Sequence, residues 1–207
     1  MSDLNMPGRS RNSLFLCIST CILFFLRCDL LVWDGDPPAQ PNVLTTRDST
    51  AVRAILDANG LQDVGVRDVI NLQDSRVGTI NFNTIGITSF VFTSALDTFT
   101  SGFSVDIIDC PVETLLVLDT IHIDLTIGIA RTNLREIPDN ISLFKGYLYL
   151  YLPDNQIKYI SPEIMRCDIG FIDIANNRLC TVSDSLNKWI LSKRPNNQNW
   201  QATQKCN

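Results

Sequence analysis

The sequence lacks several features that most catalytic and nucleic-acid-binding proteins need. Among its 207 residues, only 19% are charged, and His122 is the one histidine. A single histidine leaves little scope for His-based catalysis or histidine-rich metal sites. The net charge of −5, without a basic run, argues against nucleic acid as the main partner. Seven cysteines are too few for a dense disulfide framework, and the length suffices to bury a core without one.

Motifs for cofactor or metal chemistry are also missing. No glycine-rich phosphate-binding loop occurs, and no cysteine has a histidine partner by motif. Asp106 and Asp109 are close in sequence, but they lack the Asp/Asn/Gly loop that is typical of calcium sites. We therefore predict no enzymatic activity, no cofactor and no metal site.

The N-terminal segment has the pattern of a secretory signal. Two arginines precede an apolar run of 13 residues, 14–26, and signal peptides combine a basic start with such a run. The run is shorter than the roughly 20 residues that span a bilayer. We predict that 1–33 is a signal peptide or lipoprotein-type leader, with a membrane anchor as the alternative. Whether Cys21 or Cys28 carries a lipid stays open.

A tether and a helical cap are predicted to follow the leader. Three prolines within 34–42 favour an extended tether over 34–47. The N-terminal cap, 48–76, would begin with a helix over Asp48–Asn59, capped by Asp48 or Ser49 and ended by Gly60. Its apolar face would consist of Ala51, Val52, Ile55 and Leu56.

Five segments repeat a doublet of apolar residues two positions apart. The doublets are separated by 22 to 25 residues and begin at Ile80, Val105, Ile127, Leu150 and Ile172. Apolar residues recur seven and ten positions after each start. Five positions after each start stand Ile85, Cys110, Thr132, Asn155 and Asn177.

This pattern resembles the leucine-rich repeat, L-x-x-L-x-L-x-x-N/C-x-L. The clearest units, 127–141, 150–164 and 172–186, resemble the family's short bacterial-type repeats. The resemblance implies an α/β fold: a leucine-rich-repeat solenoid of short parallel strands over 77–182, with helical N- and C-terminal caps. Ile85 cannot replace the consensus Asn, so the first unit should be the least regular.

The consensus Asn/Cys position predicts a ladder of inward-facing polar side chains. An Asn there can bond backbone groups of neighbouring units that would otherwise be buried without a partner. Cys110, Thr132, Asn155 and Asn177 are the ladder residues. Cys110 is thus expected to be a buried thiol, about two units from Cys167 and too far away to pair with it.

The last segment, 183–207, is predicted to be the C-terminal cap. Ser183 or Asp184 can cap a helix over Leu186–Lys193, with Trp189 and Ile190 facing the last unit. The chain would then return through Trp200, which we interpret as packing within the cap. A disulfide between Cys180 and Cys206 would close the cap and contribute about 3 kcal/mol. Two reduced thiols are the alternative.

Strand residues that point away from the core would form rows across the outer face of the sheet, and one part of this face is aromatic. Tyr149, Tyr151 and Phe171 cluster in these rows, bordered by the polar candidates Arg131, Asp154, Asp173 and Asn176. Aromatics rimmed by polar groups are typical of binding hot spots, and the family resemblance implies a concave face that holds the partner. Aromatic residues also favour strands for packing alone.

We predict a non-catalytic binding module that is exported to the cell envelope or outside the cell and recognises a protein. Contact with a membrane is expected only through the leader or a lipid. The alternatives are a structural or assembly module and an accessory module that binds polysaccharide.

Overall fold

The computed structural model describes residues 43–73, 75–99, 102–194 and 199–206, all within one folded unit, 40–207. The predicted leader and most of the predicted tether lie outside the described residues. Among the helices that are described, none has the length and apolar character needed to cross a bilayer.

The described chain begins with helix α1 (Thr46–Ala58), which packs its predicted apolar face into the core. The predicted cap is wrong: Thr45 Oγ1 accepts the hydrogen bond from the Asp48 N–H at 3.0 Å. Asp48 is fully buried and serves another purpose, because its carboxylate accepts from the Arg76 guanidinium at 2.9 Å. A short helical turn, η1 (Val66–Asp68), follows.

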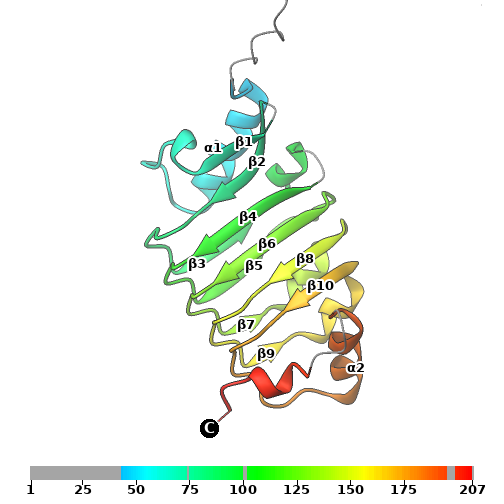
Figure 1. Ribbon diagram of the computed structural model, residues 1–207. Helices are drawn as coiled ribbons and strands as arrows, with labels where there is room; N and C mark the ends of the chain where they lie inside the picture. The colour runs from blue at the N-terminus through cyan, green and yellow to red at the C-terminus, as the bar shows by residue number, and fades with distance from the viewer. Residues whose placement is uncertain (1–42, 74, 100–101, 195–198, 207) are drawn as a thin grey trace, which may run out of the picture. The chain divides into compact units, whose positions relative to one another are not determined.

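One mostly parallel sheet dominates the structure (Figure 1). Strand β1 (Ile70–Gln73) runs antiparallel to β2 (Arg76–Asn81), an arrangement that the sequence did not predict. From β2 onward the strands are parallel and lie in chain order: β4 (Phe103–Ile108), β6 (Leu125–Ala130), β8 (Leu148–Tyr151) and β10 (Ile169–Asp173). The doublet residues pair across these strands in the predicted register, Ile80, Val105, Ile127, Leu150 and Ile172.

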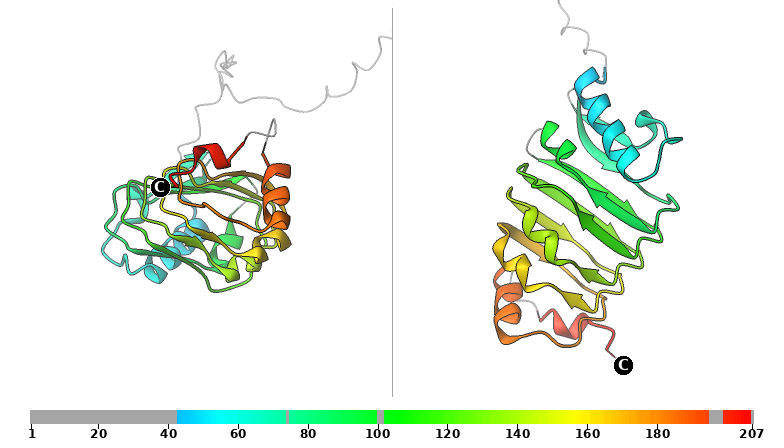
Figure 2. Two further views of the ribbon diagram at one scale, coloured as in Figure 1. Left: turned by 90° about the horizontal axis from the view of Figure 1, so that it is seen from below. Right: turned by 180° about the vertical axis from the view of Figure 1, so that it is seen from behind.

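The chain between two sheet strands forms a second row behind the sheet. Strand β3 (Ser89–Phe92) pairs with β5 (Thr114–Val117), and β7 (Glu136–Ile137) pairs with β9 (Tyr159–Ile160). Short helical turns follow three of these strands: η2 (Ser94–Thr98), η3 (Asp139–Leu143) and η4 (Pro162–Arg166). Figure 2 shows this second row from behind. We call the chain from one sheet strand to the next a unit.

The core lies between the two rows and changes in character along the chain. From the first unit to the third it is rich in phenylalanine: Phe82, Phe90, Phe92 and Phe144 form a chain of edge-to-face contacts with ring centroids 4.8 to 5.4 Å apart. Later units contribute mainly isoleucine and leucine.

Helix α2 (Asp184–Ser192) covers the last unit. Ser183 caps it as predicted, accepting from the Leu186 N–H at 3.3 Å. Trp200 is also buried as predicted, and its indole donates to Asn187 Oδ1 at 3.0 Å. A last helical turn, η6 (Gln201–Thr203), leads into the C-terminal segment.

Candidate functional site

Each of the five parallel strands is followed by a sharp turn. The turn residue has a left-handed backbone, with φ between 54° and 61°, at Thr84, Asp109, Arg131, Asp154 and Asn176. Asn and Asp tolerate this conformation better than other residues with side chains, whereas a β-branched residue such as Thr84 is strained there. The turn directs the next residue, at the ladder position, toward the core.

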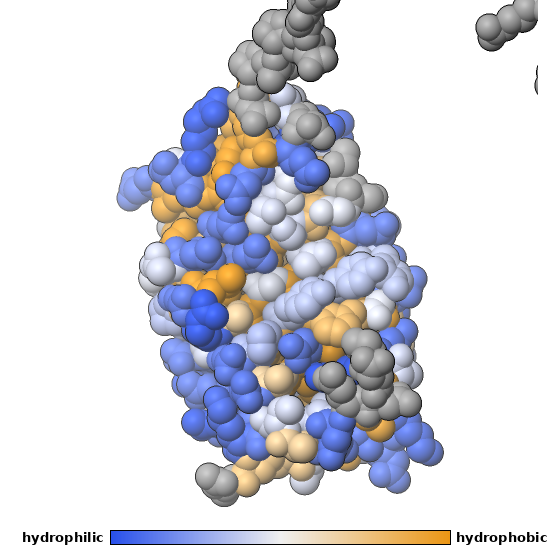
Figure 3. Space-filling model, viewed as in Figure 1, coloured by the Kyte–Doolittle hydropathy of each residue, from blue (hydrophilic) through white to orange (hydrophobic). Residues whose placement is uncertain are grey.

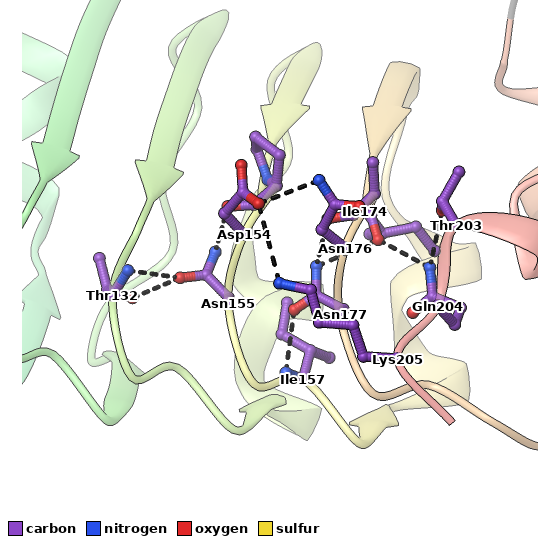
Figure 4. Close-up of polar contacts among 12 residues, drawn as sticks. Thr132, Asp154, Asn155, Ile157, Ile174, Asn176, Asn177, Thr203, Gln204 and Lys205 are labelled. Carbon is purple, nitrogen blue, oxygen red and sulfur yellow. Dashed lines mark hydrogen bonds and ion pairs between the residues drawn. The ribbon is translucent and has the colours of Figure 1, made fainter. Parts of the chain in front are cut away.

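The predicted ladder residues are buried, and most contact the neighbouring unit (Figure 4). Asn155 Nδ2 donates to the Ile129 carbonyl at 2.7 Å, and Asn177 Nδ2 donates to the Leu152 carbonyl at 2.8 Å. Cys110 Sγ donates to the Phe82 carbonyl. These three carbonyls occupy equivalent positions in the first, third and fourth units, two residues after the start of each doublet. Thr132 is different, because its hydroxyl donates to Asn155 Oδ1 at 2.6 Å.

A glutamine in the C-terminal segment continues the ladder, which sequence reasoning missed. Gln204 Nε2 donates to the Ile174 carbonyl at 2.9 Å, the position equivalent to Leu152. Its Oε1 accepts from the Leu179 N–H at 3.2 Å, just as Asn177 Oδ1 accepts from Ile157 N–H at 2.9 Å. The segment therefore caps the last unit, because Gln204 makes the two bonds that a ladder residue of a further unit would make.

The C-terminal segment is also held by covalent and backbone bonds. Cys180 and Cys206, the predicted pair, lie at disulfide distance with Cα atoms 5.6 Å apart. The Lys205 N–H donates to the Asn177 carbonyl at 2.7 Å. Cys110 and Cys167 are buried and unpaired with each other, as predicted. Burial raises the pKa of the Cys167 thiol to about 11.

The solvent-facing side of the six-stranded sheet carries four aromatic residues, which we call the aromatic patch: Tyr147, Tyr149, Tyr151 and Phe171. The three tyrosines are 37% to 43% exposed. Ring centroids are 5.2 Å apart for Tyr147 and Tyr149, and 4.9 Å apart for Tyr151 and Phe171. In Figure 3 this side of the sheet shows side chains of intermediate hydropathy bordered by hydrophilic ones.

Sequence reasoning missed Tyr147, although the alternation Tyr-Leu-Tyr-Leu-Tyr over 147–151 places all three tyrosines on one side of a strand. Tyr147 lies over a glycine of the neighbouring strand. A Cβ atom added at Gly170 would clash with the Tyr147 ring and hydroxyl in their present position. The pairing of β10 with β8 also shifts register between Ile169 and Phe171, around this glycine.

The end of α2 closes one side of the aromatic patch and creates a groove of about 440 Å³. Tyr149, Tyr151, Gly170 and Phe171 line the groove together with Ser192, Lys193 and Arg194. The Arg194 guanidinium donates to Asp173 Oδ1 at 3.2 Å, and its side chain is 7% exposed. The predicted residue Asp173 thus borders the patch by holding an arginine. No periodic signal in the sequence places Arg194 there.

Three other predicted binding residues do not line this groove. Arg131, Asp154 and Asn176 occupy the row of left-handed turns. There Asn176 Nδ2 donates to Asp154 Oδ1 at 3.0 Å. Arg131 donates to both carboxylate oxygens of Asp109, at 2.7 and 2.9 Å, and this hydrogen bonding lowers the pKa of Asp109. The predicted binding residues therefore fall into two groups: those at the groove and those in the row of left-handed turns.

The histidine and the free cysteines of the described chain lie in different surroundings. The exposed His122 ring contacts Asp97 at 3.2 Å. Burial raises the pKa of both free thiols, so they are poor nucleophiles at neutral pH. Within the described part of the chain, no three His, Cys, Asp or Glu side chains are grouped so that they could hold a metal ion.

Comparison with known proteins gave no significant match to any protein-family model, curated protein or solved structure.

Proposed function

We propose that this chain is an exported leucine-rich-repeat module that recognises a protein through the aromatic patch and its groove. The repeat assignment is supported by the in-register strands and by amide rungs at the consensus Asn position. The binding assignment depends on one observation: three tyrosines are each more than a third exposed on a single sheet face, beside a groove.

The geometry of the patch favours a protein over a sugar. A sugar ring stacks on a flat aromatic face, but Tyr147 meets Tyr149 at an interplanar angle of 72°. Tyr151 and Phe171 are tilted by 41°. Such an uneven surface suits side chains that insert between the rings, and tyrosine anchors are common in protein interfaces.

Export is supported by two features. The basic start and short apolar run of 1–33 are typical of a signal. A disulfide between Cys180 and Cys206 persists in oxidising compartments and is rare in reducing ones.

The experiment begins with capture of partners from the native cell surface by the purified protein, identified by mass spectrometry. The affinity of each captured protein is then measured for wild type and for the double variant Tyr151→Ala/Phe171→Ala. Hot-spot residues contribute at least about 2 kcal/mol each, so we expect the double variant to lose roughly a hundredfold or more in affinity.

Tyr159→Ala is the matched control, because Tyr159 is also a strand tyrosine and is 48% exposed, but on β9 in the second row. It should leave the affinity unchanged. Unaltered binding by the double variant would refute the proposal, provided that its melting temperature matches that of the control. Capture of a polysaccharide instead of a protein would assign the face to the accessory function.

A further inference from the structure

A second pocket lies at the C-terminal end of the repeats, apart from the aromatic patch. Its volume is about 540 Å³, and it is lined by Lys158, Arg178, Cys180, Thr181, Lys205 and Cys206. No residue of this pocket lines the groove on the sheet face. We call it the basic pocket, because three of its side chains carry a positive charge.

The charge of the basic pocket is largely uncompensated. Among the described residues, no carboxylate lies within 4.0 Å of the Lys158 or Arg178 side-chain nitrogens. Lys205 Nζ is 4.0 Å from Asp154 Oδ1, at the limit of an ion pair. Counted over the described residues, three cations against one carboxylate leave a local charge of about +2, on a chain whose net charge is −5. Like charges gathered in this way repel one another unless an anion joins them.

Backbone hydrogen bonds fix the main chain of all three cationic residues, whose side chains are exposed. The Lys158 N–H donates to the Arg135 carbonyl at 2.8 Å, and the Arg178 N–H donates to the Ile157 carbonyl at 2.9 Å. Lys205 is bonded to Asn177 and is next to the disulfide. The three residues come from two adjacent units and from the C-terminal segment, so the pocket is complete only when that segment is docked.

We propose that the basic pocket binds a divalent oxyanion, a phosphate or sulfate group. A charge of −2 would balance the local charge of about +2, which a single carboxylate cannot do. Arginine presents a planar fork of donors to such oxygens, and lysine adds point charges. This site is independent of the proposed protein-binding face, since the two share no lining residue.

Isothermal titration calorimetry with inorganic phosphate, inorganic sulfate and acetate tests the proposal, at pH 8 and constant ionic strength. We expect saturable binding of one divalent anion per chain and none of acetate at the same concentration. A charge-assisted hydrogen bond contributes about 1.5–3 kcal/mol. Arg178→Gln and Lys158→Gln should therefore each weaken binding by roughly tenfold or more. Preference for phosphate or for sulfate identifies which of the two groups the pocket takes.

Arg166→Gln is the control, because Arg166 pairs with Glu163 at 2.8 Å and does not line the pocket. It should bind as wild type does. Equal affinity for acetate and the divalent anions, or full binding by Arg178→Gln, would overturn the proposal.

The disulfide gives a second readout. Reduction of the bond between Cys180 and Cys206 should weaken anion binding, because Lys205 is then held less firmly. Lys205→Gln, with the disulfide intact, separates loss of this charge from unfolding and should weaken binding by a similar factor. Unchanged binding in Lys205→Gln would remove Lys205 from the site and contradict the charge balance on which the proposal rests.

Discussion

Replacement of Gln204 by asparagine tests whether this side chain acts as a further ladder residue. The side chain would be shorter by one methylene, so its amide would withdraw from both the Ile174 carbonyl and the Leu179 N–H. Ile174 and Leu179 are buried, at 0% and 1% exposure. Each buried group left without a partner costs about 1–3 kcal/mol. The Ile174 carbonyl keeps a second donor, Asn177 Nδ2 at 3.1 Å, so the Leu179 N–H is the group left without a partner. We expect Gln204→Asn to lower the free energy of unfolding by about 1–3 kcal/mol.

Amide hydrogen exchange at Leu179 is the direct assay, because Gln204 Oε1 is the acceptor of this N–H. The expected cost corresponds to exchange that is faster by roughly 5-fold to 150-fold, and to a melting temperature lower by roughly 2–12 °C. The Ile157 N–H, held by Asn177, serves as the internal reference.

Gln201→Asn is the matched substitution in the same segment. Gln201 is exposed and donates to Asn187 at 2.8 Å, so its variant should melt within about 1 °C of wild type. If Gln204→Asn exchanges and melts as wild type does, the glutamine amide does not act as a rung.

Two further predictions concern the left-handed turns and the buried thiols. Thr84→Asn should stabilise the protein by about 0.5–1 kcal/mol in denaturant unfolding, because φ is 61° there and asparagine tolerates it. The strand variant Thr114→Asn should not be stabilising, and equal gains from both would refute the explanation. With a pKa of about 11, Cys167 is roughly a hundredfold less ionised at pH 8 than a thiol of pKa 9. Site-resolved alkylation should therefore be at least that much slower in the folded protein than in urea, and equal rates would contradict the burial argument.

Sequence periodicity predicted the register of the sheet because each unit repeats the same local requirements. An apolar doublet must face the core, and a polar group must meet the backbone where the strand ends. The residues between the two apolar positions of each doublet agree with this alignment, because Asn81, Asp106, Gly128, Tyr151 and Asp173 pair in turn across neighbouring strands. Repetition made the alignment possible without any knowledge of contacts between distant residues.

Features that occur once could not be found in the same way. Aspartate is a residue type that often caps helices, but the Asp48 carboxylate pairs with Arg76, 28 residues away. Arg194 reaches Asp173 from the end of a helix, and Gln204 uses a longer side chain than the consensus asparagine. In each case a tertiary contact determines the role, and no sequence period encodes it.

The two ends of the ladder differ in the forces that hold them, and this gives them different responses to temperature. The first unit has Ile85 at the ladder position and relies on the chain of phenylalanine contacts, whereas the last units use buried amides. Hydrophobic stabilisation weakens on cooling. Apolar side chains fill the core of every unit, but the later units add buried amide bonds to it. We therefore expect cooling to loosen the first unit before the last ones, where the aromatic patch and the basic pocket lie.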